Sequence, residues 1–79
     1  MVAFPLMRTD VNAHITGIVW KIDVKKGDRV EEGQVCVILE SMKMEIPVEA
    51  TVAGIVETIH VTDGQSVAEG QALLTLVTA

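Results

Sequence analysis

Short apolar runs separated by polar turns are the main pattern of this 79-residue chain. Some runs alternate hydrophobic with polar residues, and others, such as residues 36–39 and 73–76, are wholly or largely apolar. Many of the apolar residues are β-branched, which is typical of short strands with one or both faces buried. No stretch of about ten residues combines helical periodicity with capping residues. The pattern therefore predicts an all-β chain.

The pattern occurs twice. Residues 11–40 align with residues 48–77 at a constant offset of 37, without a gap, and 13 of the 30 aligned positions are identical. Each copy predicts a few short strands, too few to bury their apolar face alone, so the two copies should interlock around a pseudo-twofold axis. We expect a flattened, roughly eight-stranded barrel-sandwich hybrid over residues 10–79. Residues 1–9 are expected to form a short N-terminal arm.

Glycines recur at equivalent positions of the two copies. Glycine is the residue best suited to a positive φ, so those in polar segments between apolar runs predict tight turns. The predicted structural turns contain Gly17, Gly27, Gly33, Gly54, Gly64 and Gly70.

Residues 41–47 are left between the two copies, and Lys43 lies among them. The flanking segments read as two strands of a hairpin, and the best two-residue loop is Met42-Lys43. Such loops need positive φ and usually contain glycine, whereas other residues adopt positive φ at a free-energy cost. A local rule broken at an exposed turn indicates function. We expect Lys43 to be presented to a large enzyme, with Met42 and Met44 as adaptable recognition groups.

Composition narrows the function further. The net charge of −5 argues against nucleic acid and anionic membranes as partners, and the apolar runs are too short to span a bilayer. The N-terminus is too short for a signal peptide and lacks a basic start. A single cysteine excludes an internal disulfide and favours a reducing compartment, so we expect a cytoplasmic protein. The starting methionine indicates a free subunit, with an excised domain as the alternative.

Three other residue types invite a functional reading. Cys36 lies in an apolar run and is expected to be an inert core thiol. His14 and His60 lack the spacing of a metal site, so no metal is predicted. Trp20 aligns with polar Glu57 in the second copy, which places it on the outer face, either as ordinary surface or as a partner contact.

The hairpin run Glu40-Ser41-Met42-Lys43-Met44-Glu45 resembles the attachment site of the biotinyl/lipoyl carrier family. Residues 46–50, the segment 24–34 and its second copy at 61–71 carry the same resemblance. It covers about residues 11–77, and it is closest to biotinyl domains and to small free-standing biotin/lipoyl attachment proteins. The segment Ala13–Gly17 departs from the family, which often has proline there.

The resemblance implies biotin in amide linkage on Lys43. Methionines on both sides of the lysine mark the biotin branch of the family, whereas the lipoyl branch typically has Asp before the lysine and Ala after it. Biotin is therefore expected in preference to lipoate. The remaining hairpin residues are expected to serve ligase recognition: Glu40, Ser41, Met42, Met44 and Glu45. Because the repeat has no gap, no room is left for the "thumb" insertion of some biotin carriers.

A carrier of this kind is not itself an enzyme. The resemblance implies that a biotin protein ligase modifies it, and that biotin then moves a carboxyl group between biotin carboxylase and carboxyltransferase or decarboxylase subunits. As an isolated domain it is expected to be monomeric. Two alternatives stay open: a lipoyl carrier of an oxo-acid dehydrogenase-type complex, and an unmodified interaction module with the same barrel.

Overall fold

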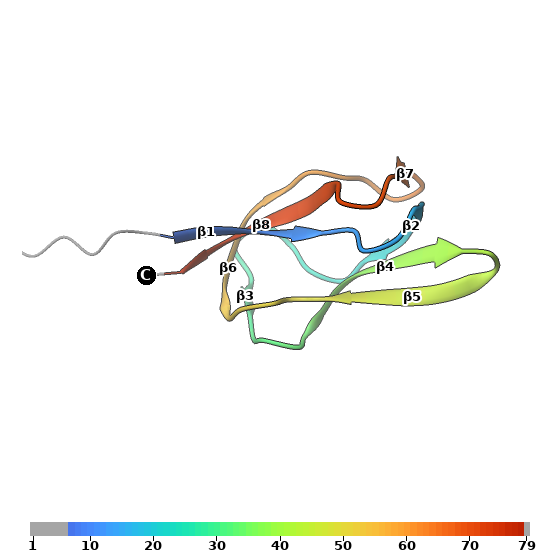
Figure 1. Cartoon of the computed structure of the whole chain (residues 1–79). Helices are drawn as coiled ribbons and strands as arrows, with labels where there is room; N and C mark the ends of the chain where they lie inside the picture. Colours follow the sequence, from blue (N-terminus) through green and yellow to red (C-terminus); the bar gives the residue numbers. More distant parts are fainter. Residues whose placement is uncertain (1–6, 79) are drawn as a thin grey trace, which may run out of the picture.

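The computed structural model describes residues 7–78 and contains eight strands and no helix in that range (Figure 1). Four strands form a sheet in the order β1-β8-β6-β3, here called the open sheet, and the other four form the hairpin sheet, in the order β5-β4-β2-β7. All pairings are antiparallel. The predicted all-β class and two-layered architecture are confirmed. The strands are β1 (Met7–Asn12), β2 (Gly17–Ile22), β3 (Arg29–Val30), β4 (Val35–Ser41), β5 (Met44–Glu49), β6 (Gly54–Ile59), β7 (Ser66–Val67) and β8 (Ala72–Thr78).

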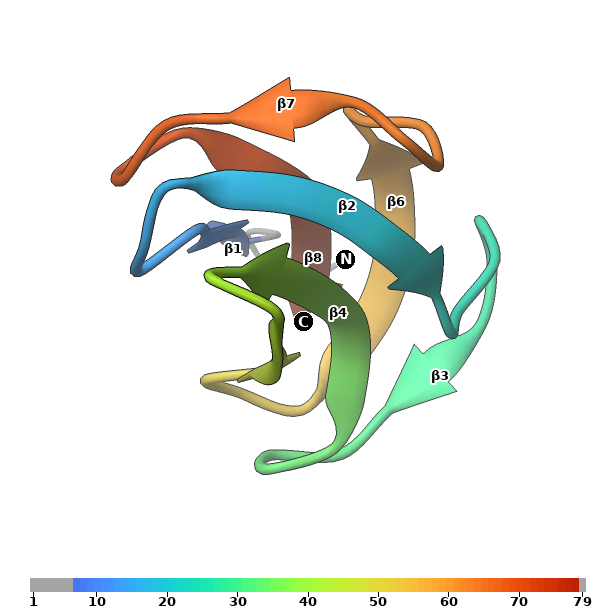
Figure 2. The same ribbon diagram turned by 90° about the vertical axis from the view of Figure 1, so that its right-hand side faces the viewer.

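The two halves of the chain interlock. Adding 37 to the bounds of β1, β2, β3 and β4 gives the bounds of β5, β6, β7 and β8. The same shift converts the strand order of one sheet into that of the other. Each sheet therefore contains strands of both halves, as Figure 2 shows in a view onto the hairpin end. The predicted pseudo-twofold arrangement is confirmed.

The core obeys the same symmetry. Sixteen buried apolar side chains form one cluster, and each has its repeat equivalent in that cluster. Burial of a valine or leucine side chain contributes roughly 1.5–3 kcal/mol. Each half therefore gains stability by covering apolar side chains that the other half would leave exposed to water. The eight equivalent pairs are Val11/Val48, Ala13/Ala50, Val19/Val56, Val24/Val61, Val30/Val67, Cys36/Leu73, Val37/Leu74 and Leu39/Leu76.

Part of the expected N-terminal arm belongs to a strand. Strand β1 begins at Met7, and residues 7–9, expected in the arm, pair with β8 through Met7–Thr78 and Arg8–Val77. The repeat is recognised by identical residues over 11–40, and among residues 7–10 only Met7 is identical to its equivalent, Met44. Backbone pairing continues there because a ladder hydrogen-bonds main-chain groups whatever the side chains. The rest of the expected arm, residues 1–6, lies outside the described residues.

The six glycines have two different roles. Four of them have φ between 84° and 94°, as predicted for turns: Gly27, Gly33, Gly64 and Gly70. The turn prediction is wrong for Gly17 and Gly54, which begin β2 and β6. A Cβ at Gly17 would lie 2.6 Å from the carbonyl oxygen of Glu40, and one at Gly54 would lie 2.8 Å from that of Val77. These two glycines are needed because a neighbouring strand approaches closely.

Glycine turns of each half are hydrogen-bonded to strands of the other half. The Gly64 amide donates to the Val19 carbonyl at 2.7 Å, and the Gly27 amide donates to the Val56 carbonyl at 2.8 Å. Buried main-chain groups near the sheet edges are satisfied in this way. The bonds tie the β6–β7 turn to β2 and the β2–β3 turn to β6, whereas β2 is held beside β4 by their own strand pairing.

Candidate functional site: the Lys43 hairpin

Lys43 occupies a two-residue turn at the tip of the hairpin between β4 and β5. Ser41 pairs with Met44 across the turn, and Met42 and Lys43 have φ values of 52° and 64°. Two successive left-handed residues are the geometry of a type I′ turn, whose twist matches that of the flanking strands. The loop predicted from the sequence is confirmed, and so is its unusual backbone. Among residues 7–78, Met42 and Lys43 are the only non-glycine residues with positive φ.

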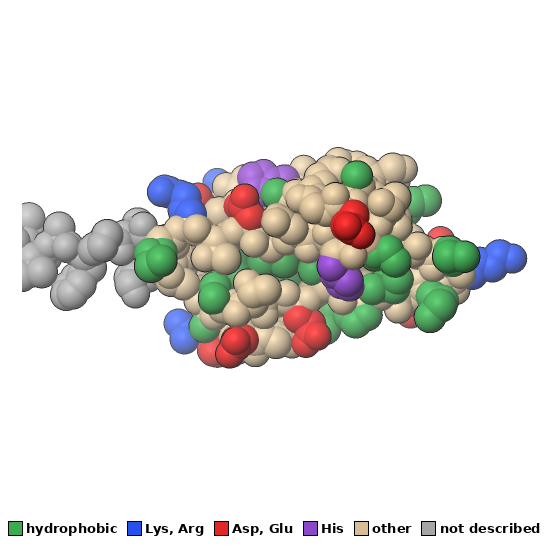
Figure 3. Space-filling model, in the orientation of Figure 1, with side chains coloured by type: hydrophobic (Ala, Val, Ile, Leu, Met, Phe, Trp, Pro, Cys, Tyr) green, Lys and Arg blue, Asp and Glu red, His purple; other side chains and the backbone are tan. Residues whose placement is uncertain are grey.

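The turn is fully presented to solvent. Lys43 is exposed, and the side chains beside it, Met42 and Met44, are 92% and 65% exposed. In Figure 3 the far end of the hairpin carries a basic group flanked by hydrophobic groups. The ion pairs among residues 7–78 do not involve Lys43. Its amine is therefore accessible to a reaction partner.

The two strands of the hairpin are anchored in the core, whereas the turn that joins them is exposed to solvent. Strand β4 lies between β5 and β2 in the hairpin sheet, and Val37, Leu39 and Val48 anchor the two hairpin strands in the core. Because both strands are fixed, the turn has little freedom to fold back. The turn between β4 and β5, which contains Lys43, consequently projects from the body of the barrel (Figure 1).

The other hairpin residues predicted to take part in recognition surround this tip. Glu40 and Glu45 are both exposed and lie directly opposite each other on β4 and β5. Ser41 is half-buried, and it lies near the Cα of Gly17, since a Cβ built there would be 3.5 Å from that of Ser41. The structure brings these residues and the two methionines together around Lys43. Their role in recognition stays a prediction.

Cys36 does not belong to the site. Its side chain is completely buried in β4, and its Sγ donates a hydrogen bond to the Gln34 carbonyl at 3.5 Å. Burial raises the pKa of the Cys36 thiol above its usual range, with a smaller contribution from the charge of Asp23. The reactive thiolate is therefore disfavoured. The thiol is a core residue, as expected.

The histidines have surface and structural positions. His14 is exposed, whereas His60 Nε2 lies 2.7 Å from the Thr75 hydroxyl, which donates to Asp10 at 2.7 Å. Within residues 7–78 no three His, Cys, Asp or Glu side chains gather in a way that would hold a metal ion.

Over the same range, no helix has the length and hydropathy to cross a membrane. A shallow hollow lies at the other end of the barrel, lined by residues of β3, β6 and β8 such as Arg29, Gly54 and Val77.

Trp20 is recognisable from the sequence as an outward residue, whereas its neighbour Ile18 is not. Trp20 is 48% and Ile18 44% exposed on the outer face of β2, on either side of buried Val19. The outward position expected for Trp20 is confirmed. Alternation around Val19 was the signal available for Ile18, but its identity to Ile55 made it look like a core position.

Comparison with known proteins gives a consistent set of relatives. A family model described as "Biotin-requiring enzyme", the biotin/lipoyl family, matches residues 5–76. The biotin/lipoyl attachment protein of Bacillus subtilis (strain 168) is 55% identical over 38 residues, which are 48% of this chain and 52% of that protein. The biotinylated protein TB7.3 of Mycobacterium tuberculosis (strain ATCC 25618 / H37Rv) is 52% identical over 42 residues, 53% of this chain and 59% of that protein. These matches thus span little more than half the length of either relative.

Solved structures share the fold. The urea carboxylase of Kluyveromyces lactis superposes with a TM-score of 0.86 at 33% identity, over 96% of this chain and 7% of that chain. A single-chain, multi-domain long-chain acyl-CoA carboxylase gives a TM-score of 0.86 at 28% identity, over 100% of this chain and 8% of that chain. In both, the similar region is a small part of a much larger carboxylase.

Proposed function

The chain belongs to the biotin/lipoyl family of biotin-requiring enzymes, and from this premise we propose that Lys43 is the residue to which biotin is covalently attached. The observation that carries the proposal is the exposed, left-handed Met42-Lys43 turn at the tip of a rigid hairpin. The biotin-carrier role expected from the sequence agrees with the carboxylases and biotinylated proteins that the chain resembles.

The attachment reaction needs little from the carrier beyond presentation. The deprotonated Nζ of Lys43 attacks the acyl carbon of biotinyl-adenylate bound to a biotin protein ligase. An amide C–N bond forms, the C–O bond to the adenylate breaks, and AMP leaves with the electron pair. The ammonium proton passes to a base of the ligase, since activation of a lysine nucleophile requires a base or desolvation. Among residues 7–78, no carrier side chain forms an ion pair with Lys43 that would have to be broken first.

The hairpin suits the group it would hold. An exposed turn can carry a bulky substituent without disturbing the core, and replacing a charged amine by an amide leaves no buried partner unpaired. Attached biotin would supply transfer of a carboxyl group. The protein supplies position, and tethering gives a high effective concentration at the partner sites. We propose that those sites belong to biotin carboxylase and carboxyltransferase or decarboxylase subunits, and that the domain is a non-catalytic carrier.

The side chains next to Lys43 favour biotin over lipoate. Met42 and Met44 present flexible apolar surface at the tip, with 92% and 65% of each exposed. A ligase that accepts such a tip needs a complementary apolar surface, whereas an aspartate before the lysine would leave a charge there unpaired. The free, buried Cys36 supports a reducing compartment, and we place the carrier in the cytoplasm.

Mass measurement of the intact protein, produced with an active biotin protein ligase, tests the proposal. The expected result is a single added biotinyl group, retention on avidin, and loss of both in Lys43→Arg. Lys26→Arg is the matched control, because Lys26 is also an exposed turn lysine. Retention of Lys43→Arg on avidin would place the modification elsewhere, and the mass of a lipoyl group would assign the chain to the other branch.

A further inference from the structure

The outer face of the hairpin sheet differs from that of the open sheet, although the two are equivalent in the repeat. Each of β2 and β6 has a register irregularity, next to Trp20 in one strand and next to Glu57 in the other. In the open sheet Glu57 accepts a salt bridge from Arg8 at 2.8 Å. The equivalent residues of the hairpin sheet are Trp20 and Glu45. The fold therefore accepts a polar residue at this position, and it does not require tryptophan.

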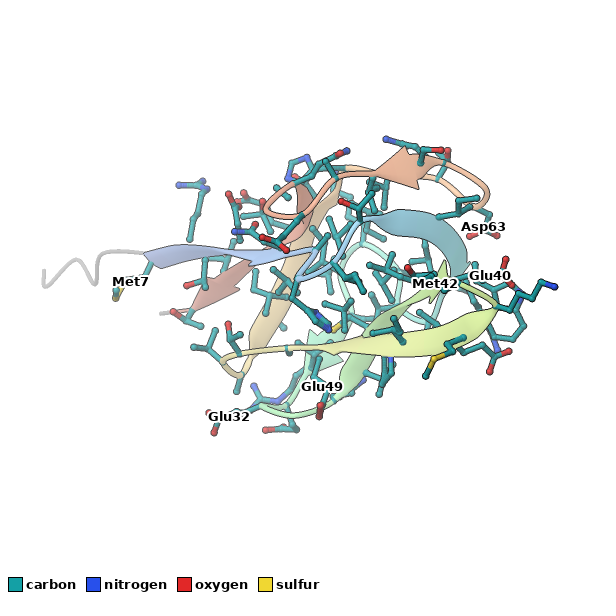
Figure 4. All side chains as sticks on the ribbon, turned by 45° about the vertical axis from the view of Figure 1, so that its right-hand side comes forward. Met7, Glu32, Glu40, Met42, Glu49 and Asp63 are labelled. Atoms are coloured by element: carbon teal, nitrogen blue, oxygen red, sulfur yellow. The ribbon has the colours of Figure 1, made fainter. Side chains whose placement is uncertain are left out.

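Trp20 belongs to an apolar and acidic surface that continues from the Lys43 hairpin. Ile18 pairs with Glu40, and Glu40 pairs with Glu45, so these three side chains form one row across the sheet. Ile18 and Trp20 are 44% and 48% exposed. Asp63, in the β6–β7 loop, lies at the same end of the barrel as Glu40 (Figure 4).

The basic side chain that follows Trp20 in β2 is already paired. The Nζ of Lys21 lies 3.4 Å from Asp23. The surface therefore presents Ile18 and Trp20 with an acidic border. Alternation about buried Val19 turns Trp20 outward, and the register irregularity between Val19 and Lys21 gives Trp20 no cross-strand partner in β4. Aromatic residues with a polar border are typical of protein–protein contacts.

We infer that Ile18 and Trp20, bordered by Glu40 and Glu45, form the surface on which the biotin protein ligase docks. This inference rests on the proposed function of Lys43. Unmodified lysine has only a four-carbon stem, so its amine reaches an acyl group only when the hairpin itself enters the ligase. The ligase must then approach the adjacent outer face of β2. Later partners meet a carrier whose biotin arm extends the reach of the lysine, so they need no such approach.

The charge of the surface also suits this partner. The hairpin that brings the Lys43 amine to the active site of the ligase also carries Glu40 and Glu45. The ligase surface around its active-site cleft should therefore be basic. Opposite charges speed the encounter of two proteins and fix their orientation. An aromatic residue that becomes buried in the complex supplies most of the binding free energy. We expect a ligase with an apolar, basic-rimmed cleft that receives Trp20.

Steady-state kinetics of biotin transfer, with purified ligase and the unmodified carrier as the varied substrate, tests the inference. The variants are Trp20→Glu, which installs the residue of the second copy, Ile18→Ser, and the two together. For the double variant we expect KM for the carrier to rise about tenfold while kcat stays within about twofold. Ile55→Ser is the matched control, because Ile55 is the repeat equivalent of Ile18 and is 41% exposed on the other sheet.

Thermal melting establishes that each variant is folded, and the single variants carry the test if the double variant is not. Unchanged KM in folded variants, with the parent biotinylated on Lys43, would overturn the docking inference and leave the proposed function intact. A parent that gains no biotin would instead refute the proposed function. If Trp20→Glu impaired carboxylation by a purified biotin carboxylase but not biotin transfer, the surface would belong to that partner and the inference would be wrong.

Discussion

The two ends of the barrel have the same strand pairing but different closures. At one end β4 and β5 pair through Ser41 and Met44, and the chain continues between them through Met42 and Lys43. At the other end β8 and β1 pair through the equivalent residues Thr78 and Met7, and no turn joins them. Core and glycine turns are equivalent on both sides. The scaffold is therefore common to the two ends, and the chemistry lies in two turn residues.

Replacing Lys43 by glycine separates the chemistry of the turn from its stability. Biotin attachment should be lost completely, whereas the free energy of unfolding should rise by about 1 kcal/mol, because glycine adopts positive φ without the cost that lysine bears. Avidin retention and thermal melting measure the two effects. A variant that melted at a lower temperature would show that the lysine side chain supports the hairpin, and that the turn was not kept for function alone.

The two close-approach glycines test the symmetry of the scaffold. Gly17→Ala and Gly54→Ala should each lower the free energy of unfolding by roughly 2–4 kcal/mol, because each new Cβ would meet a backbone carbonyl at 2.6 or 2.8 Å. Chemical denaturation measures this loss. Only Gly17→Ala should also slow biotin transfer, since the carbonyl it displaces belongs to Glu40, close to the hairpin tip. Equal transfer rates for the two variants would show that biotin transfer tolerates movement of β4 near the tip.

The glycine turns should respond more mildly and equally. Gly27→Val and Gly64→Val introduce a β-branched residue at φ of 94° and 84°, and each should cost on the order of 1–3 kcal/mol. No atom lies within 4 Å of the added Cβ in either turn, so backbone strain alone is measured. Melting curves that differed clearly between the two variants would contradict the equivalence of the halves.

Methionine substitutions compare the hairpin end of the barrel with the opposite end, where Met7 lies. They are expected to have the smallest effect on stability. Met44 and Met7 are repeat equivalents and each is 65% exposed. Met42→Asp combined with Met44→Ala should slow biotin transfer by about tenfold and leave the melting temperature nearly unchanged, because little core packing is lost and a ligase contact becomes charged. Met7→Ala should change neither quantity. The rate at fixed ligase concentration is the measurement, and a double variant as fast as the parent would show that the ligase reads only the lysine's position.

Much of this structure could be predicted because the repeat constrains it twice. Val19 and Val56, for example, confirm each other as core residues, and the turn glycines recur at the same offset. Structure was harder to predict from the sequence where the two copies of the repeat differ. It was also harder where an identical residue in both copies can have more than one structural cause. Gly17 and Gly54 match, but the sequence does not distinguish a positive φ from a close approach. Of residues 7–9, Met7 alone is identical to its repeat equivalent, Met44, and a single isolated match does not reveal that β1 extends there.

The site was predictable for a different reason. Met42 and Lys43 violate the residue preferences of a tight hairpin turn, and the violation is visible without coordinates. Ile18 was not recognised, because an isoleucine repeated in both halves has the sequence appearance of a core residue. Its exposure depends on the pairing of β2 with β4 and β7, which is a property of the assembled sheets.

Strand β8 lies between β1 and β6 in the open sheet, yet it is the last strand of the domain to be synthesised. Until it leaves the ribosome, β1 has no hydrogen-bonding neighbour in its sheet, and the core lacks Leu73, Leu74 and Leu76. Lys43 is therefore translated well before the scaffold that presents it can form. A ligase that recognises the folded hairpin would act only on completed domains, so biotin would not be attached to nascent or truncated chains.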